Sequence, residues 1–309
     1  MYLSVIVPVY NEEGAAAKLH AEILAMCKTL DRPFEIIFIN DGSSDKTVEV
    51  LKTLSPIKIV NLRRNFGQTA AMDAGIKAAA GKYLATLDGD GQNDPADIPK
   101  LIQKLEKDDL DAVSGWRKDR QDKKSKRWAS LCAAFVRKFL INDGIHDSGC
   151  SLKVYKKECF AKVTLYGEMH RFIPAILKIK GFKIGEEVVN HRARTTGKTK
   201  YNWKRGVKGI LDMCSVWFWQ KYAARPLHLF GGAGVLFMMI SAISAVWAVC
   251  GKIFQGNDLS NSSFTFLAMF AFFTGATFFA FGLISDVLSK MYFGATNDDH
   301  YDVKEIIEK

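Results

Sequence analysis

Short apolar runs alternate with longer segments of helical spacing over the first third of the chain. The runs are rich in β-branched residues, and the longer segments place apolar residues three or four positions apart. This pattern predicts strands at 3–9, 35–39, 57–62 and 83–87, with helices at about 12–30, directly after Asp45, and at 67–80. Strands and helices that alternate in this way form crossover units on a mostly parallel sheet. We therefore expect an α/β fold for this part of the chain.

Polar residues follow each predicted strand at its carboxyl end, at positions 10–12, 40–43, 63–65 and 88–90. Ligands of open parallel sheets bind beyond the carboxyl ends of the strands, so one cleft should collect these residues. The first strand is followed neither by Gly-x-Gly-x-x-Gly nor by a P-loop lysine motif. These two modes of phosphate binding are therefore not expected here.

Two long apolar segments lie in the last third of the chain. Segment 227–250 has no Asp, Glu, Lys or Arg, and segment 264–288 has only Asp286. Each exceeds the roughly 20 residues that span hydrocarbon, which favours a membrane hairpin over a buried hairpin of a soluble protein. The cations place both ends of the hairpin on the cytoplasmic side, because the connecting loop carries only Lys252 while the flanks carry Lys204, Arg205, Lys208, Lys221, Arg225 and Lys290. The start of the chain has no basic n-region, so we expect no signal peptide.

These patterns divide the chain into a cytosolic domain at 1–200, an amphipathic juxtamembrane region at 201–225, a two-helix transmembrane hairpin at 226–290 and a cytosolic tail at 291–309. In the juxtamembrane region, aromatic and aliphatic residues fall on one helical face and lysines on the other. Such a helix should lie in the headgroup plane, the alternative being a core helix of the first domain. We expect a multi-pass protein of the inner or plasma membrane, and allow for a homo-oligomer.

Composition changes this picture in one respect. The chain has 309 residues, of which 48% are hydrophobic, so it has ample core material for folded domains. Its net charge is +10, and nucleic acid is the usual partner of so basic a chain. The cations precede a membrane segment and no nucleic-acid motif, so anionic lipid phosphate is the better match and nucleic acid is not expected. The six cysteines lack metal-type spacing, and we assign them no chemistry.

Two carboxylates end the fourth strand. Asp88 and Asp90 flank a glycine, and Gln92 lies just beyond. Hard oxygen ligands on a tight turn suit Mg²⁺ or Mn²⁺ held against a diphosphate. Ordinary turn chemistry is the alternative, because Asp and Gly are common turn residues.

Four motifs stand in one order along the chain: Pro-Val-Tyr-Asn-Glu-Glu at 8–13, Asn-Asp-Gly-Ser-Ser-Asp at 40–45, Arg-Asn-Phe-Gly-Gln at 64–68 and Leu-Asp-Gly-Asp-Gly-Gln at 87–92. In order and spacing they resemble the large inverting glycosyltransferase family with the GT-A fold. With the two apolar segments, the whole chain resembles its polyprenyl-phosphate branch, which includes dolichol-phosphate mannose synthases and undecaprenyl-phosphate glucosyl and aminoarabinosyl transferases. The resemblance implies a Rossmann-like GT-A domain at 1–200 and a glycosyltransferase activity.

The resemblance also implies site roles. Nucleotide-sugar binding falls to Pro8, Tyr10, Glu12, Asp41, Asp88 and Gln92, and the metal to Asp88, Asp90 and Gln92. Chemistry agrees for Asp41, whose carboxylate can accept from base N–H or ribose hydroxyl groups. Helix capping is the alternative for a carboxylate here, and Asp45 is the better cap because a helix follows it directly.

Two later motifs resemble the acceptor side of the same branch. Asp147 opens Asp-Ser-Gly-Cys-Ser-Leu-Lys, where many relatives have an acidic residue in place of Cys150 and an aromatic-Arg pair in place of Leu152-Lys153. Asp147 either orients the acceptor or acts as an auxiliary base. The basic stretch 192–201 resembles the Arg-x-x-Gly-x-Ser-Lys-Tyr stretch of the branch, with Thr199 in place of the serine. Because it lies just before a membrane segment, Arg194, Lys198 and Lys200 are candidates for the acceptor phosphate, and a solvated basic loop is the alternative.

Arg117 is the candidate cation for the leaving diphosphate, and Asp147, Asp90 and Arg117 form the expected catalytic set. Arg117 also opens a charged run, 117–127, that a solvated lid would explain equally well.

The function predicted is transfer of a sugar, with inversion, from a UDP- or GDP-sugar to an undecaprenyl or dolichyl phosphate, for cell-envelope or glycan assembly. A phosphate monoester with a second pKa of roughly 6 is already a nucleophile near neutral pH, so no strong base is needed. One alternative is a membrane-anchored glycosyltransferase acting on a sugar or protein hydroxyl. The other is a non-catalytic, membrane-anchored adaptor that binds a sugar nucleotide.

Overall fold

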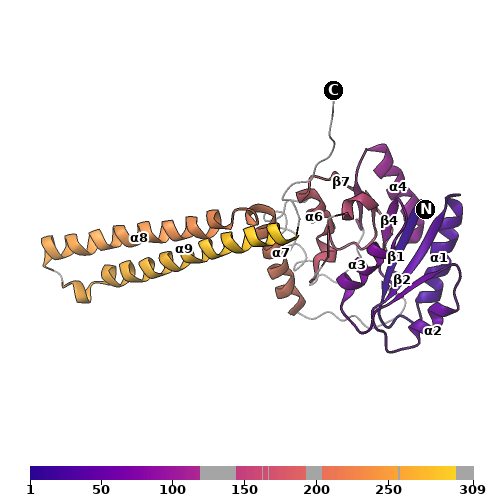
Figure 1. Ribbon diagram of the computed structural model, residues 1–309, viewed down its shortest axis with the longest axis horizontal. Coiled ribbons are helices and arrows are strands. Elements are labelled where there is room, and N and C mark those ends of the chain that lie inside the picture. The colour runs from indigo at the N-terminus through magenta and orange to yellow at the C-terminus, as the bar shows by residue number, and fades with distance from the viewer. Residues whose placement is uncertain (119–143, 162, 166, 193–203, 257, 297–309) are drawn as a thin grey trace, which may run out of the picture. The chain divides into compact units, whose positions relative to one another are not determined.

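The structure, a computed structural model, describes residues 1–118, 144–161, 163–165, 167–192, 204–256 and 258–296 (Figure 1). The chain forms two compact units, Met1–Val216 and Trp217–Lys309. Residues 119–127 of the predicted lid, the acceptor candidates Arg194, Lys198 and Lys200, and residues 297–309 of the predicted tail lie outside the described residues.

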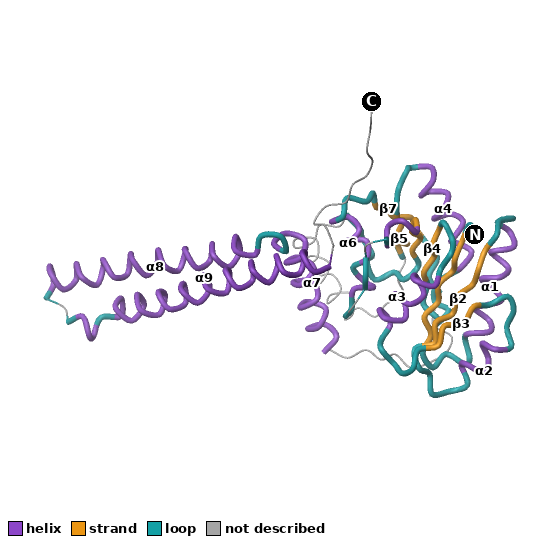
Figure 2. Tube along the Cα trace, in the orientation of Figure 1, coloured by secondary structure: helices purple, strands orange, loops and turns teal. Residues whose placement is uncertain are grey.

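The first unit is built on a seven-stranded sheet of order β3-β2-β1-β4-β6-β5-β7. Figure 2 draws its strands in orange. Strands β1 to β4 are mutually parallel, β6 runs antiparallel to both β4 and β5, and β7 is parallel to β5. The predicted mostly parallel α/β sheet is therefore confirmed. The strands are β1 (Leu3–Val9), β2 (Phe34–Asn40), β3 (Lys58–Asn61), β4 (Tyr83–Thr86), β5 (Ala112–Trp116), β6 (Lys153–Lys156) and β7 (Ile184–Val188).

Helices cover both faces of this sheet. They are α1 (Ala16–Thr29), α2 (Thr47–Lys52), α3 (Gln68–Ala78), α4 (Ile98–Lys107) and α6 (Ile173–Ile179), with short 3-10 helices η1 (Pro95–Asp97), η2 (Lys157–Phe160) and η3 (Met169–Arg171). The first helix begins at Ala16 rather than near residue 12. Glu12 and Glu13, which were expected in its first turn, belong to the preceding loop. Their N–H groups donate to Thr47 Oγ1 and Asp45 Oδ2, which ties that loop to the start of α2.

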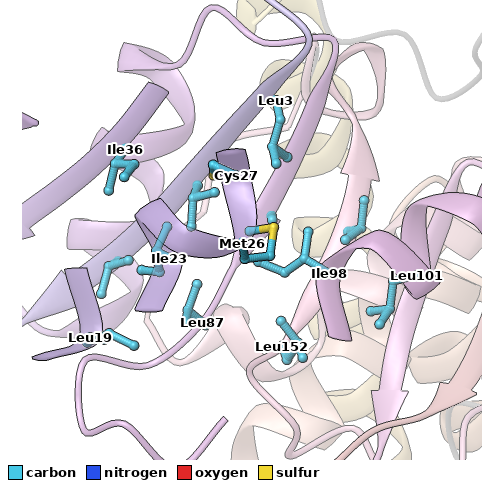
Figure 3. Packing of buried hydrophobic residues seen from close by; sticks show 14 of the residues in the cluster. Leu3, Leu19, Ile23, Met26, Cys27, Ile36, Leu87, Ile98, Leu101 and Leu152 are labelled. Atoms are coloured by element: carbon cyan, nitrogen blue, oxygen red, sulfur yellow. The ribbon is translucent and has the colours of Figure 1, made fainter. Parts of the chain in front are cut away.

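Alternation along β1 divides the core into two layers. Leu3, Val5, Val7 and Val9 point to the face that α1, α2 and α4 cover, as Figure 3 shows for Leu3 beside the α1 and α4 side chains. Ile6 points to the other face, where α3 and α6 pack. Each fully buried aliphatic side chain contributes roughly 1.5–3 kcal/mol relative to exposure, so the two layers fix the sheet firmly.

The register of the parallel strands brings their carboxyl ends to one edge. Val9 at the end of β1 pairs with Asn40 at the end of β2, and Asn40 pairs with Asn61 at the end of β3. On the other side of β1, Ile6 pairs with Thr86 at the end of β4. The four polar loops that follow these strands therefore leave the sheet at the same edge.

Helix α7 (Lys204–Tyr222) begins in the first unit and continues into the second. Met213 and Val216 are buried in one cluster with Phe172 and Ala175. Leu211, which belongs to the predicted apolar face, is 64% exposed. Met213 and Val216 thus fit the alternative of a core helix of the first domain. Leu211 faces outward, as the interfacial helix requires.

The second unit is a helical hairpin of α8 (Pro226–Gln255) and α9 (Ser263–Thr296), connected through η4 (Leu259–Asn261). Residues 226–254 and 263–293 have mean hydropathies of 2.2 and 2.0 in their most apolar windows, and only 22% of each window is buried. By length and composition, both helices are able to cross a membrane.

Candidate active site

The loops after β1 and β2 interlock at the sheet edge. Asn11 has a left-handed backbone with φ of 56°, a conformation that Asn tolerates better than most residues. Its Oδ1 accepts the N–H of Ser44 at 2.8 Å, and its own N–H donates to Ser43 Oγ at 3.0 Å. Next to Asn11, Tyr10 is exposed at the sheet edge and Glu12 is partly buried. Pro8 lies within β1 and is buried.

Asp41 is buried at the end of β2 and connects that strand to α3. Its two carboxylate oxygens accept the N–H groups of Phe66 at 2.7 Å and Gly67 at 3.0 Å. The turn after it requires glycine, because Gly42 has φ of +66° and a Cβ there would lie 2.4 Å from the carbonyl carbon of Arg64. A carboxylate has about four acceptor positions, so Asp41 can brace this loop and still accept from a nucleoside.

Asp45 has a structural role, but it lies one residue before Lys46, the N-cap of α2, and is not itself the cap. Its Oδ1 accepts the N–H of Thr47, the first residue of α2, at 3.0 Å. Burial opposes its charged form, but the hydrogen bonds from Thr47 outweigh that effect and lower the pKa of Asp45.

Asp88 and Asp90 follow β4 and approach each other closely enough to interact. Asp88 is held by Gln68, whose Nε2 donates to Asp88 Oδ1 at 2.6 Å. Burial, with the charge of Asp90 as the next contribution, raises the pKa of Asp88. Asp90 Oδ1 accepts the N–H of Gln92 at 3.1 Å. A cation between these carboxylates would relieve the repulsion that raises the pKa.

The donor set of this turn fits a hard divalent cation. The described part of the chain contains no group of three or more His, Cys, Asp or Glu side chains that could hold a metal by themselves. Mg²⁺ typically takes one or two protein carboxylates and fills its remaining positions with water and substrate phosphate. Asp88 and Asp90 supply carboxylates of that kind.

Arg117 and Asp147 form a buried, bidentate ion pair. Arg117 Nε and Nη2 donate to the two oxygens of Asp147 at 2.7 and 3.0 Å, and the side chains are only 11% and 8% exposed. Burial opposes the charged guanidinium, but the hydrogen bonds and charge of Asp147 prevail and raise the pKa of Arg117. Arg117 is therefore anchored in the fold. The alternative of a solvated lid does not fit this residue.

Glu186, on β7, holds the loop that carries Asp147. Its Oε1 accepts the N–H groups of His146 at 2.7 Å and Asp147 at 3.1 Å, and its Oε2 lies 2.7 Å from His146 Nδ1. The His146 ring stacks on Trp116 with ring centroids 4.5 Å apart. The ion pair of Asp147 with Arg117 thus rests on a second layer of contacts.

A cavity of about 110 Å³ opens beside Asp88. It is lined by strand residues of β4 and β6, by α3, by the loop 148–151 and by η3. The lining residues are Gln68, Met72, Thr86, Asp88, Ser148, Gly149, Cys150, Ser151, Lys153, Tyr155, His170 and Arg171. Cys150 is fully buried, and burial raises the pKa of its thiol, which agrees with the absence of assigned chemistry.

Sequence reasoning missed Gln68 and Glu186 as contributors to the site. Gln68 stands in the quoted motif at 64–68, and its position at the start of α3 was the available signal. No sequence signal pointed to Glu186, because β7 lies far along the chain from residue 147. Only the pairing of β7 with β5 brings Glu186 close to Asp147. At the start of the basic stretch, Arg192 pairs with Glu22 at 2.8 Å and Asp94 at 2.7 Å.

The family model of glycosyl transferase family 2 matches residues 4–164, more than half of the chain. The chain belongs to this family. It is 36% identical to dodecaprenyl-phosphate galacturonate synthase of Rhizobium johnstonii, over 99% of this chain and 93% of that protein. It is 29% identical to undecaprenyl-phosphate 4-deoxy-4-formamido-L-arabinose transferase of Pseudomonas syringae pv. syringae, over 99% and 91%. The family 2 membership confirms the predicted glycosyltransferase.

Solved structures confirm the GT-A fold of this family 2 enzyme. Glucosyl-3-phosphoglycerate synthase from Mycobacterium tuberculosis superposes with a TM-score of 0.57 at 17% identity, over 71% of this chain and 79% of that one. Mannosyl-3-phosphoglycerate synthase from Rubrobacter xylanophilus gives 0.59 at 14% identity, over 72% and 75%. At these identities the likeness concerns the fold.

Proposed function

We propose that this enzyme transfers a sugar, with inversion, from a UDP- or GDP-sugar to the phosphate of a membrane polyprenyl phosphate. The observation that carries the proposal is the pairing of Arg117 with Asp147 in the same unit as the Asp88 and Asp90 turn. The Asp88 and Asp90 turn offers carboxylates for a metal-bound diphosphate. Arg117, fixed by Asp147, offers a cation for the acceptor phosphate. The names of the two full-length relatives, both polyprenyl-phosphate sugar transferases, support this choice of acceptor.

The chemistry needs few protein groups. An oxygen of the acceptor phosphate attacks the anomeric carbon, the bond from that carbon to the diphosphate oxygen breaks, and the electron pair leaves with the nucleoside diphosphate. A phosphate monoester is largely ionised near neutral pH, so the enzyme does not have to remove a proton first. Placing two anions in line is the main task, and the guanidinium of Arg117 lowers the repulsion between them.

A divalent cation bound to Asp88 and Asp90 would supply charge neutralisation for the leaving diphosphate. Solved neighbours of the same fold contain Mn²⁺ or Mg²⁺ with UDP, which supports a divalent metal here. Asp41, Tyr10 and Pro8 are the proposed contacts of the nucleoside, and Arg194, Lys198 and Lys200 are the proposed cations for the acceptor phosphate.

Asp147 favours a phosphate acceptor over a hydroxyl acceptor. A hydroxyl group needs a general base within hydrogen-bond reach of its proton. Both oxygens of Asp147 already accept from Arg117, so this carboxylate is better placed to position the guanidinium than to remove a proton.

We further propose that α8 and α9 cross the inner or plasma membrane with the catalytic unit on the cytoplasmic side. Lys252, which was predicted in the loop and lies in the last turn of α8, is the one cation between the two apolar segments, whereas Lys221, Arg225 and Lys290 lie at the opposite ends of the helices. A homo-oligomer is part of this expectation but carries no weight in the mechanism.

A comparison of acceptors tests the proposed function. Full-length protein in neutral detergent is given a labelled UDP- or GDP-sugar with Mg²⁺ or Mn²⁺, and either undecaprenyl phosphate or the matching alcohol, undecaprenol. We expect labelled lipid with the phosphate alone. Equal labelling of the alcohol would contradict the phosphate acceptor and favour a hydroxyl-directed transferase.

A further inference from the structure

The cavity beside Asp88 has an unusual charge arrangement. Three of its lining side chains are basic, namely Lys153 on β6 and His170 and Arg171 on η3. Asp88 is the one carboxylate among the lining residues, and the proposed metal would neutralise it. The cavity therefore offers positive charge that this carboxylate does not balance.

Lys153 is the main reason to expect an anionic ligand. It is 4% exposed, and its Nζ donates to the carbonyl oxygens of Ser148 and Cys150. Within the described ranges, no carboxylate oxygen comes within salt-bridge distance of Lys153 Nζ. Burial lowers the pKa of Lys153, although the charges of Asp147 and Asp88 act from farther away in favour of its ammonium form, and an anion in the cavity would offset the cost of burial. An ammonium has three donors, so one remains for a ligand.

Arg171 is suited to the same task. Its Nη2 lies 3.8 Å from Glu168, a distance beyond a normal hydrogen bond, and its side chain is 39% exposed. The neighbouring His170 is fixed by Thr69, whose Oγ1 lies 2.7 Å from His170 Nδ1. The backbone of Arg171 is thus fixed by the 3-10 helix η3, while its guanidinium can still turn toward a ligand.

Size and position indicate which part of the substrate enters. Sites that enclose a drug-sized ligand occupy roughly 300–1,000 Å³, so 110 Å³ holds only a part of a nucleotide sugar. One wall is Asp88, from the proposed diphosphate site, and another is Gly149, where a Cβ would lie 3.2 Å from Arg117 Nη2. The cavity therefore borders Asp88 on one side and, through Gly149, approaches Arg117 on another, a position that suits the transferred sugar.

We propose that the transferred sugar carries a carboxylate, as a hexuronic acid does, and that Lys153 and Arg171 bind it in this cavity. The inference rests on the proposed function, because it assigns the sugar of the same donor. The acceptor phosphate is the other source of an anion with this chemistry, and the experiment below separates the two.

The test compares matched donors on the full-length enzyme. UDP-glucuronate is paired with UDP-glucose and UDP-galacturonate with UDP-galactose, so each pair differs only in carboxylate or hydroxymethyl at C6. A charge-assisted contact implies a preference of roughly tenfold or more in kcat/KM for at least one uronate over its neutral partner. Equal use of both members in both pairs would overturn the inference.

Two variants locate the preference. Arg171→Gln should reduce it several-fold, and Lys153→Met, which keeps the length of the side chain, should abolish it. Lys157→Met is the matched control, because this exposed lysine begins η2 and lies outside the cavity lining. If Lys153→Met does not fold, Arg171→Gln carries the comparison, since its residue is partly exposed. An unchanged preference in Arg171→Gln and in any folded Lys153→Met would overturn the assignment.

Donor binding without lipid separates the two sources of the anion. Each unlabelled donor competes with labelled UDP, and the uronate should compete better than its neutral partner in wild type but not in the variants. A raised KM for undecaprenyl phosphate with no effect on donor choice would overturn the inference and give the cavity to the acceptor. This arm needs no transfer, so it stands even if polyprenyl phosphate proves not to be the acceptor.

Discussion

The two units of this enzyme are built in opposite ways. In the first, aliphatic side chains such as Ile23 and Ile37 are fully buried, and polar residues gather at the ends of the strands. In the second, large apolar side chains face outward, with Phe270 77% exposed and Trp247 64% exposed. The interior of the hairpin is instead made from small and hydroxyl-bearing residues.

Close backbone contact explains the interior of the hairpin. A Cβ on Gly234 would lie 2.8 Å from the carbonyl oxygen of Gly275, so the helices meet where side chains are absent. Ser241 Oγ donates to the carbonyl oxygen of Ala268 at 2.7 Å. In hydrocarbon, burial of apolar area does not drive helix association, and packing of small residues with interhelical hydrogen bonds takes its place.

The difference teaches that the interior and surface of each unit suit the solvent around it. Water drives the first unit together and leaves its polar strand ends free for chemistry, whereas the second unit is consistent with lipid around it. Substitutions in one unit should therefore change one kind of measurement and leave the other unchanged.

The largest expected effect is on chemistry in the first unit. Asp90→Ala should lower turnover on the order of a thousandfold, because loss of the bound cation removes several kcal/mol of charge stabilisation. Turnover is measured at saturating Mg²⁺ or Mn²⁺, with thermal unfolding as the check on the fold. Asp108→Ala is the control, since Asp108 forms a surface pair with Lys104. Near wild-type turnover of Asp90→Ala in chelator-treated buffer would refute the metal assignment.

A smaller effect is expected for the basic stretch between the sheet and α7. Arg194→Ala and Lys198→Ala should each lower acceptor efficiency roughly ten- to a hundredfold, the value of a charge-assisted phosphate contact. Donor binding should stay the same. Acceptor titration in neutral detergent is the measurement, and unchanged curves for both variants would leave these residues as an electrostatic tether.

A further step down, Glu186→Ala should reduce kcat roughly tenfold by releasing the loop that positions Asp147 and Arg117, with part of the loss restored in Glu186→Gln. The neighbouring Glu187→Ala is the matched control, because Glu187 pairs with Lys100 and Lys104 instead. Steady-state kinetics with both substrates checks this. Equal losses in the two variants would mean that β7 matters only for stability.

The smallest effect on chemistry is expected in the hairpin. Gly234→Ala should destabilise α8 against α9 by about 1–3 kcal/mol, because the added methyl group must push two backbones apart. Gly232→Ala is the control, since a Cβ there meets nothing within 4 Å. Thermal unfolding in detergent should separate the variants while UDP-sugar binding stays equal. A hairpin that tolerates both alike would contradict the close packing.

Local pattern predicted the first half of the sheet well. Strand β1 occupies 3–9 as expected, and no bound of β2, β3 or β4 differs from its prediction by more than one residue, because these strands are apolar runs between clear helices. Strands β5 to β7 were not predicted. Each is short, β6 joins the sheet antiparallel, and their pairing depends on partners distant in sequence.

The site was predicted as residue types and not as an arrangement. The spacing of Asp88 and Asp90 on one turn is enough to identify them as candidates. The contact of Asp41 with the loop at 66–67 requires the placement of α3, and the pairing of Arg117 with Asp147 requires two chain segments that sequence does not connect. Lys153 could be noted as a departure from a motif, but its burial, with no carboxylate of the described residues within salt-bridge distance, emerges only from the folded sheet.

Transfer to lipid in a bilayer tests the central claim most directly. Full-length enzyme is reconstituted in vesicles with undecaprenyl phosphate, a divalent cation and a panel of labelled UDP- and GDP-sugars, and lipid-linked label and released nucleoside diphosphate are both measured. The account predicts that, for one donor, the two products appear in equal amounts, with inverted anomeric configuration, and that Asp90→Ala abolishes both. Release of nucleoside diphosphate without lipid-linked sugar, or label found on a hydroxyl acceptor instead, would contradict it.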